Sequence, residues 1–96
     1  MQVIKRDGTV VDYDRAKIAV AIGKANAEME EKERASGEEI ESILSYIEGK
    51  KKKRMLVEDI QDIIEEKLME QGHYELAKTY IIYRYNRALV RKANTT

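Results

Sequence analysis

The sequence predicts a mainly α-helical domain with a small β-sheet, in which an N-terminal β-hairpin and a short third strand cap a four-helix bundle. Three observations support this prediction. The 96 residues include no proline and only five glycines, a balance that favours helices over an all-β fold. An Asp-Gly pair near the N-terminus lies between runs rich in β-branched residues, which indicates a hairpin. Beyond it, apolar residues recur with helical spacing in four separate segments.

The hairpin is expected from Val3–Arg6 and Thr9–Tyr13, which flank Asp7-Gly8. A type I′ turn requires positive φ at both central positions, which Asp tolerates and Gly adopts freely. The sequence therefore predicts a type I′ turn at Asp7-Gly8.

Two helices are expected on either side of the charged segment 28–37. Asp14 can cap the first helix, and Ser36 with Glu39 matches a capping box that opens the second, which Gly49 ends. The apolar positions expected in the first helix are Ile18, Val20, Ala21, Ile22, Ala25 and Met29. Those expected in the second helix are Ile40, Ile43, Leu44 and Ile47.

A short third strand is expected at Met55–Val57, because this apolar trio precedes the next helical pattern and needs a partner. A third helix is expected from about Val57 until Gly72 stops it, and a fourth from about Tyr74 to Lys92. Arg84 falls between two tyrosines and is expected to face water. The side chains expected to be buried are Ile60, Ile63, Ile64, Leu68, Leu76, Ala77, Tyr80, Ile81 and Leu89, with Tyr83 or Tyr85 at the boundary.

Composition excludes several classes of protein. Lys+Arg and Asp+Glu are equal at 18 each, whereas a non-specific nucleic-acid binder usually carries a basic excess. With no cysteine there is no disulfide framework and no cysteine zinc site, and a single histidine, His73, argues against a histidine metal site. No apolar run approaches the roughly 20 residues of a membrane helix, and the first residues do not resemble a signal peptide. A cytoplasmic domain without membrane or metal is expected.

The sequence contains no recognised catalytic motif. It lacks the glycine-rich phosphate loops, the zinc-protease histidine pair and the serine nucleophile elbow. The carboxylates of 28–41 are typical of a solvated face, and His73 beside a helix break is expected to be a polar junction residue. This segment is therefore not expected to be an enzyme.

Cations cluster around the hairpin in a way that favours anion binding. Lys5 and Arg6 end the first strand, and Lys17 lies in the first turn of the helix, whose N-terminus presents free N–H groups. Neighbouring residues of a strand point to opposite faces, so Lys5 and Arg6 converge only if the turn rotates one of them. A phosphate site and a plain solvated hairpin both remain open on this ground.

Three segments in order resemble the signature segments of the ATP-cone domain: VIKRDGTVVDYDRAKIAVAIGKA, VEDIQDIIEEKL and GHYELAKTYIIYRYNR. The resemblance covers about Val3 to Arg91. ATP-cones are regulatory nucleotide-binding modules of many ribonucleotide reductases and of a bacterial repressor of reductase genes. Their fold, a four-helix bundle capped by a small three-stranded sheet, agrees with the one predicted from the residues.

The resemblance implies nucleotide-binding roles for eight residues: Val3, Lys5, Arg6, Asp14, Lys17, Val57, Gln61 and Arg87. Lys5 and Arg6 match the phosphate-binding pair, and Val3 matches the residue against the adenine. The other five match polar, basic or nucleotide-facing positions on three helices. Val57 and Gln61 replace Thr and His of some members, and Val11 replaces an acidic residue, which leaves the sugar contacts and the ATP-versus-dATP preference open.

The family further implies a domain at residues 1–92, with residues 93–96 starting a linker to a missing downstream region. Its expected role is to bind ATP or dATP, with Mg²⁺, and so to regulate the overall activity of a ribonucleotide reductase. The catalytic domain of that reductase is the expected partner, with a homo-oligomer on dATP binding. The end of the chain is similar to the segment just after the cone in anaerobic, glycyl-radical ribonucleoside-triphosphate reductases, which makes such a parent the favoured one.

Three other functions are considered. A fragment of the reductase-gene repressor type would be a nucleotide-responsive transcriptional regulator, but this chain lacks the repressor's cysteine-rich zinc ribbon. A DNA-binding regulator would use the basic run Lys50–Arg54, which is more often a solvated loop. A helical adaptor without ligand would use the tyrosines Tyr80, Tyr83 and Tyr85, which are more often core and boundary residues.

Overall fold

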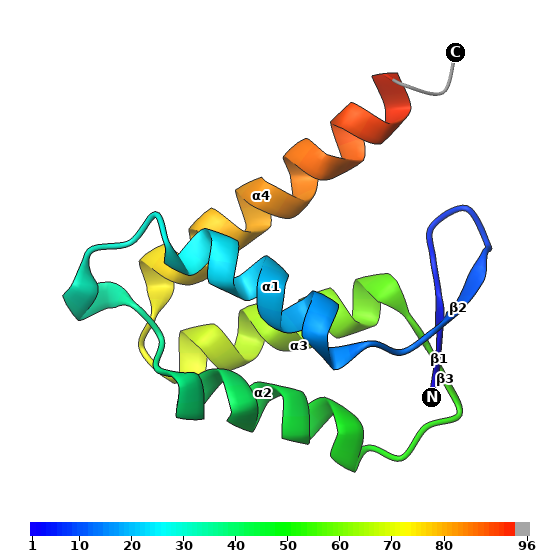
Figure 1. Cartoon of the computed structure of the whole chain (residues 1–96), viewed down its shortest axis with the longest axis horizontal. Helices are drawn as coiled ribbons and strands as arrows, with labels where there is room; N and C mark the ends of the chain where they lie inside the picture. Colours follow the sequence, from blue (N-terminus) through cyan, green and yellow to red (C-terminus); the bar gives the residue numbers. More distant parts are fainter. Residues whose placement is uncertain (94–96) are drawn as a thin grey trace.

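The computed structural model describes the backbone of residues 1–93 and the side chains of residues 1–84, and it confirms the expected fold (Figure 1). A small sheet lies at one end of a bundle of four helices. The elements in chain order are β1 (Gln2–Ile4), β2 (Val10–Asp12), α1 (Arg15–Asn26), the short 3-10 helix η1 (Glu31–Glu33), α2 (Gly37–Gly49), β3 (Arg54–Leu56), α3 (Val57–Glu70) and α4 (Tyr74–Ala93).

The sheet has the strand order β2-β1-β3, so the first strand of the chain is the central one. Val3 pairs with Val11 in the antiparallel β1–β2 ladder and with Met55 in the parallel β1–β3 ladder. Because side chains alternate along a strand, this row faces the helices, and Val3 and Met55 are buried.

The hairpin turn differs from the type I′ turn predicted at Asp7-Gly8. Gly8 has φ +86°, but Asp7 is not in the left-handed region. The Gly8 N–H donates to the Lys5 carbonyl at 2.9 Å and the Lys5 N–H to the Thr9 carbonyl at 2.8 Å, which makes Arg6-Asp7-Gly8 a three-residue loop. The type I′ prediction is wrong because the Asp7 carboxylate accepts the Thr9 N–H at 2.9 Å, which stabilises the longer loop and lowers the pKa of Asp7.

The two expected caps are present on α1 and α2. The Asp14 carboxylate accepts the Ala16 N–H at 3.0 Å, and Ser36 and Glu39 form a reciprocal capping box. Val20 is exposed, although the apolar spacing included it in the buried stripe of α1. It lies on the side of α1 that borders an open cleft rather than a neighbouring helix.

The connection from α3 to α4 is tight and polar. Gly72 has φ +85°, which ends α3 as expected. His73 Nε2 lies 2.9 Å from a carboxylate oxygen of Glu39, so this histidine is a polar junction residue that ties the connection to the start of α2.

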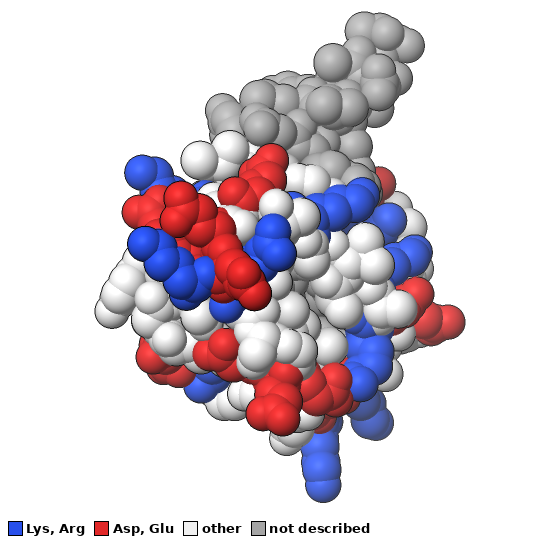
Figure 2. All heavy atoms as spheres, turned by 60° about the vertical axis from the view of Figure 1, so that its left-hand side comes forward, with Lys and Arg blue, Asp and Glu red and all other residues white. Residues whose placement is uncertain are grey.

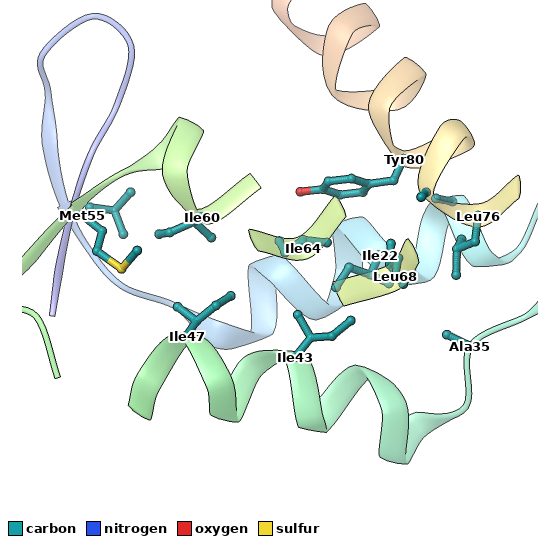
Figure 3. Close-up of a cluster of buried hydrophobic side chains, with 13 residues drawn as sticks. Ile22, Ala35, Ile43, Ile47, Met55, Ile60, Ile64, Leu68, Leu76 and Tyr80 are labelled. Carbon is teal, nitrogen blue, oxygen red and sulfur yellow. The ribbon is translucent and has the colours of Figure 1, made fainter. Parts of the chain in front are cut away.

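The core lies where the four helices meet the inner face of the sheet (Figure 3). α1 packs against α2 and α4, and α3 packs against the same two helices. The side chain predicted at Leu89 lies outside the described residues. Among residues 1–84, the buried apolar ones are Val3, Ile22, Ala25, Ala35, Ile43, Leu44, Ile47, Met55, Ile60, Ile64, Leu68, Leu76, Ala77 and Tyr80.

Charged side chains of both signs lie together on one face of the molecule (Figure 2). Figure 2 brings forward the side of the bundle that contains the α1–α2 connection, and acidic and basic side chains are interspersed on it. None of the described helices is long and apolar enough to cross a membrane.

The capping box gives a first testable prediction. Ser36→Ala removes the side-chain acceptor from the Glu39 N–H and should lower the free energy of unfolding by about 1 kcal/mol, which is a fall of about 4–8 °C in Tm for a domain of this size. Thermal unfolding followed by circular dichroism measures it. Ser42→Ala, an exposed change in the middle of the same helix, is the control; equal Tm losses in the two variants would contradict the assigned cap.

Candidate functional site

A large cleft opens between the hairpin, α1, α3 and α4, with a volume of about 860 Å³. Charged side chains reach it from the hairpin, α1 and α4, and apolar side chains from the sheet, α1 and α3. The residues that line it are Val3, Lys5, Arg6, Val11, Asp12, Tyr13, Asp14, Ala16, Lys17, Ile18, Val20, Ala21, Lys24, Val57, Ile60, Gln61, Ile64, Tyr80, Tyr83 and Arg84.

The end of the cleft beside the sheet holds the cations that the sequence singled out. Lys5, Arg6 and Lys17 all line it. The concern that Lys5 and Arg6 would point to opposite faces does not arise, because Arg6 belongs to the turn and not to the strand. The N-terminus of α1 adds its positive dipole end, and the first turn of α1 contains no acidic residue. We call this group of three cations and a helix terminus the cationic end.

Arg6 has an anionic partner within the chain. Its Nε lies 3.3 Å from a carboxylate oxygen of Glu58, in the first turn of α3. Both side chains are about half exposed, at 46 % and 56 %, so this ion pair is screened by water and readily exchanged for another anion.

The middle of the cleft is built from apolar side chains of the sheet and α3. Val3 comes from β1, and Val57, Ile60 and Ile64 come from α3. The polar residue Gln61 also lines the cleft from α3, and its Oε1 is buried without a hydrogen-bond partner.

On the wall contributed by α4, Arg84 differs from the expectation that it faces water. Its side chain is only 22 % exposed, and its Nη1 lies 2.6 Å from a Glu65 oxygen and 3.6 Å from an Asp62 oxygen. The prediction was wrong because α4 packs closely along α3, which places Arg84 against the acidic side of that helix. Burial raises the pKa of Glu65, an effect that the Arg84 cation opposes.

Two tyrosines complete this wall. Tyr80 is buried, and burial raises its pKa to about 12. In Figure 3 its ring lies over Ile64 and its hydroxyl points away from Leu76. Tyr83 lies next to Lys24 of α1, whose Nζ is 6.0 Å from the ring centre.

Seven of the eight residues proposed from the sequence line this one cleft: Val3, Lys5, Arg6, Asp14, Lys17, Val57 and Gln61. The side chain of the eighth, Arg87, lies outside the described residues. Sequence reasoning missed six lining residues with polar groups, namely Asp12, Tyr13, Lys24, Tyr80, Tyr83 and Arg84. The spacing of 80, 83 and 84 marks one face of a helix and could have identified the last three.

The basic run on the other side of the sheet does not contribute to the cleft. None of Lys50–Lys53 lines it, and Arg54 donates from Nε to the Gln2 side-chain oxygen at 3.2 Å. Among the described residues there is also no group of three or more potential metal ligands. With cations and apolar side chains in one lining, the cleft is suited to a ligand that combines an anionic group with a flat apolar one.

Comparison with known proteins shows where such a domain occurs. A family model described as the ATP cone domain matches residues 1–89. The ribonucleoside-diphosphate reductase subunit alpha of Chlamydia trachomatis is 39 % identical over 102 residues, covering 95 % of this chain and 10 % of the relative. The vitamin B12-dependent ribonucleoside-diphosphate reductase of Thermoplasma acidophilum is 36 % identical, over 95 % of this chain and 12 % of the relative. The anaerobic ribonucleoside-triphosphate reductase of Haemophilus influenzae is 32 % identical, over 94 % of this chain and 13 % of the relative. The chain thus spans about a tenth of the length of these relatives.

The Arg84–Glu65 pair gives a prediction with a defined pH dependence. Arg84→Met leaves a largely buried carboxylate without its partner, which should lower the free energy of unfolding at pH 7 by about 1–3 kcal/mol. The pKa of Glu65, already raised by burial, should rise further without the cation. As the pH falls through this pKa, the carboxyl becomes neutral and the loss should shrink.

Urea unfolding of the parent and the variant at pH 7 and at about pH 4 measures this effect. In a Glu65→Gln background the same Arg84→Met change should cost little at either pH. Equal losses at both pH values would contradict the role given to Glu65.

Proposed function

The chain belongs to the ATP-cone family, and from this we propose that it binds ATP or dATP as an allosteric effector and so regulates the overall activity of a ribonucleotide reductase. The observation that carries this proposal is the cleft itself, in which a cationic end adjoins an apolar middle. Arg offers a planar fork and Lys a point charge for phosphate oxygens, while the apolar middle is suited to a flat base. Neither end contains groups arranged for catalysis, so the proposed role of this segment is regulatory.

The proposed contacts run along the cleft from one end to the other. Lys5, Arg6 and Lys17 bind the phosphates, with Asp14 shaping the start of α1 beside them. Val3 and Val57 lie against the base from two sides. Two further positions, Gln61 and Arg87, complete the set; Gln61 lines the apolar middle, and Arg87 is proposed from the family pattern alone.

Mg²⁺ is proposed to arrive with the nucleotide. This ion binds proteins through one or two carboxylates and keeps waters and substrate phosphates as its other ligands. Asp14 lines the cleft at the cationic end and is suited to that role, and no larger set of carboxylates is needed.

The regulatory effect is proposed to come from the elements that the ligand joins. The cleft is lined by the hairpin, α1, α3 and α4, so a bound nucleotide contacts parts of the fold that are distant in sequence. A ligand shifts an equilibrium only by its difference in affinity for the two states. ATP and dATP are therefore proposed to favour different arrangements of these elements, with the catalytic domain as partner and with a homo-oligomer in the dATP-bound state.

The parent enzyme is proposed to be an anaerobic ribonucleoside-triphosphate reductase, with the domain at residues 1–92 and a linker beginning at 93–96. One relative carries the name of such an enzyme, whereas others are ribonucleoside-diphosphate reductases, including a vitamin B12-dependent one. The family itself is common to all of them, so the regulatory role does not depend on which parent is correct.

The cationic end gives a third prediction. Lys5→Ala and Arg6→Ala should each weaken ATP binding about ten- to hundredfold, because each removes a charge-assisted hydrogen bond worth about 1.5–3 kcal/mol. Isothermal titration calorimetry with ATP and dATP measures the change. The exposed Lys52→Ala, at a position outside the cleft, is the matched control. No binding by the parent at millimolar nucleotide, or unchanged affinity in both variants, would refute the proposed site.

The Arg6–Glu58 ion pair gives a fourth prediction. Because the carboxylate competes with phosphate for Arg6, Glu58→Gln should tighten ATP binding about two- to fivefold, the range of an exposed ion pair. Asp59→Asn changes the same charge in the same helical turn and is the control. A gain that persists in an Arg6→Ala background, or that Asp59→Asn reproduces, would show that the pair is not the cause.

A further inference from the structure

The backbone at the start of α1 separates two hollows of the surface. Tyr13 and Asp14 line the cleft and also a second hollow of about 760 Å³, which Arg15 and Glu48 line as well. α1 and α2 pack antiparallel, so the start of α1 lies beside the last turn of α2, where Glu48 is placed (Figure 1). The contacts that hold this partition therefore bear on the cationic end of the cleft.

A single carboxylate of α2 receives both residues that flank Asp14, the cap of α1. The Tyr13 hydroxyl donates to Glu48 Oε2 at 2.7 Å, and Arg15 Nε donates to the same oxygen at 3.0 Å. Arg15 Nη2 donates to Glu48 Oε1 at 3.3 Å and to Glu41 Oε1 at 2.8 Å. The hydrogen bond from Tyr13, with that from Arg15 adding to it, lowers the pKa of the Glu48 carboxyl. The cap is thus tied to α2 on both sides.

The extended backbone at Asp14 explains how three successive side chains divide between the two helices. Asp14 has φ −130° and ψ 102°. In extended backbone alternate side chains point to the same side, so Tyr13 and Arg15 both reach α2. The Asp14 carboxylate between them accepts the Ala16 N–H and caps α1. Glu48 therefore holds the segment that begins α1 without replacing its cap.

Arg15 is a cation in the first turn of α1, yet it does not line the cleft. The positive end of the helix dipole disfavours a cation there, and no acidic residue of this turn offsets it. Glu48 and Glu41 supply the compensating charge from α2. Single exposed ion pairs contribute little, but one arginine between two carboxylates, with a tyrosine on one of them, is a network. Lys17 of the same turn lines the cleft instead.

We propose that Glu48 is a positioning residue of the nucleotide site: through Tyr13 and Arg15 it holds the start of α1 so that Lys17 and the first N–H groups of this helix meet the phosphates. Glu48 does not line the cleft, so it acts through its partners and not on the ligand. This inference rests on the proposed function and adds the support behind the cationic end. Charge alone has the opposite effect, because removing a carboxylate near bound phosphates strengthens their binding.

The test is Glu48→Leu, which breaks all three bonds to this carboxylate. The ATP affinity should fall about three- to tenfold, within the range for neighbours coupled in one network. Arg15→Met breaks the same link from the other side and should cause a similar fall, and the double variant should bind no more weakly than either single one. Glu66→Leu removes an exposed carboxylate of α3 outside the cleft and is the matched control. Isothermal titration calorimetry measures each affinity.

Two lysine backgrounds distinguish positioning from a general loss of stability. Glu48→Leu should have a smaller effect on ATP affinity when Lys17 is already alanine, because the side chain that it positions is gone. It should keep its full effect in a Lys5→Ala background, since Lys5 belongs to the hairpin. A general loss of stability would act equally in both. Thermal unfolding without ligand shows which variants are folded, and Tyr13→Phe, which removes one bond only, replaces Glu48→Leu should that variant unfold.

The outcomes separate this inference from the proposed function. If the parent does not bind ATP, both fail. If the parent binds ATP but Glu48→Leu binds it equally or more tightly, or loses the same factor in both lysine backgrounds, the nucleotide site stands and the positioning role of Glu48 is refuted. A fall in both single variants that the double variant does not exceed, and that shrinks only with Lys17→Ala, supports the role.

Discussion

The pairing of β1 with two strands is the constraint on which the cleft depends. Three residues at the start of the chain form an antiparallel ladder with β2 and a parallel one with β3, about fifty residues later. Because α3 begins directly after β3, the parallel ladder places the first turn of α3 beside the hairpin. The anionic Glu58 thus reaches Arg6, and Val57 lies in the same cleft as Val3. Without this ladder the cationic end and the apolar middle would not adjoin.

A second feature is that carboxylates of α3 oppose cations on both sides of the cleft. Glu58 pairs with Arg6 at the exposed end, and Glu65 pairs with Arg84 at the more buried wall. The two pairs differ in what they contribute. The half-exposed pair is weakly held and available for exchange with phosphate, whereas the shielded pair joins α3 to α4 and keeps that wall in place.

The apolar middle connects the binding of a ligand to the packing of the bundle. Val3, Ile60 and Ile64 belong to the hydrophobic core and also line the cleft, and Tyr80 does both as well. A ligand lying against these side chains would contact the core directly rather than a surface loop. Since close-packed interiors transmit small displacements, a cleft of this kind is suited to linking occupancy to the arrangement of helices.

Local sequence patterns were enough to predict the elements and most of the candidate site. Rules of short range sufficed for the hairpin, for the caps at Asp14 and Ser36 and for the end of α3, because each depends on residues a few positions apart. Seven of the proposed site residues line one cleft, as their shared family pattern implied.

Other features arose only from packing. The form of the turn depended on one hydrogen bond of Asp7. The exposure of Val20 and the burial of Arg84 depended on which helix lies opposite each of them, and residue spacing within one helix does not specify that. The unpartnered oxygen of Gln61 is likewise invisible in the sequence, since burial and missing partners arise only when distant segments pack together.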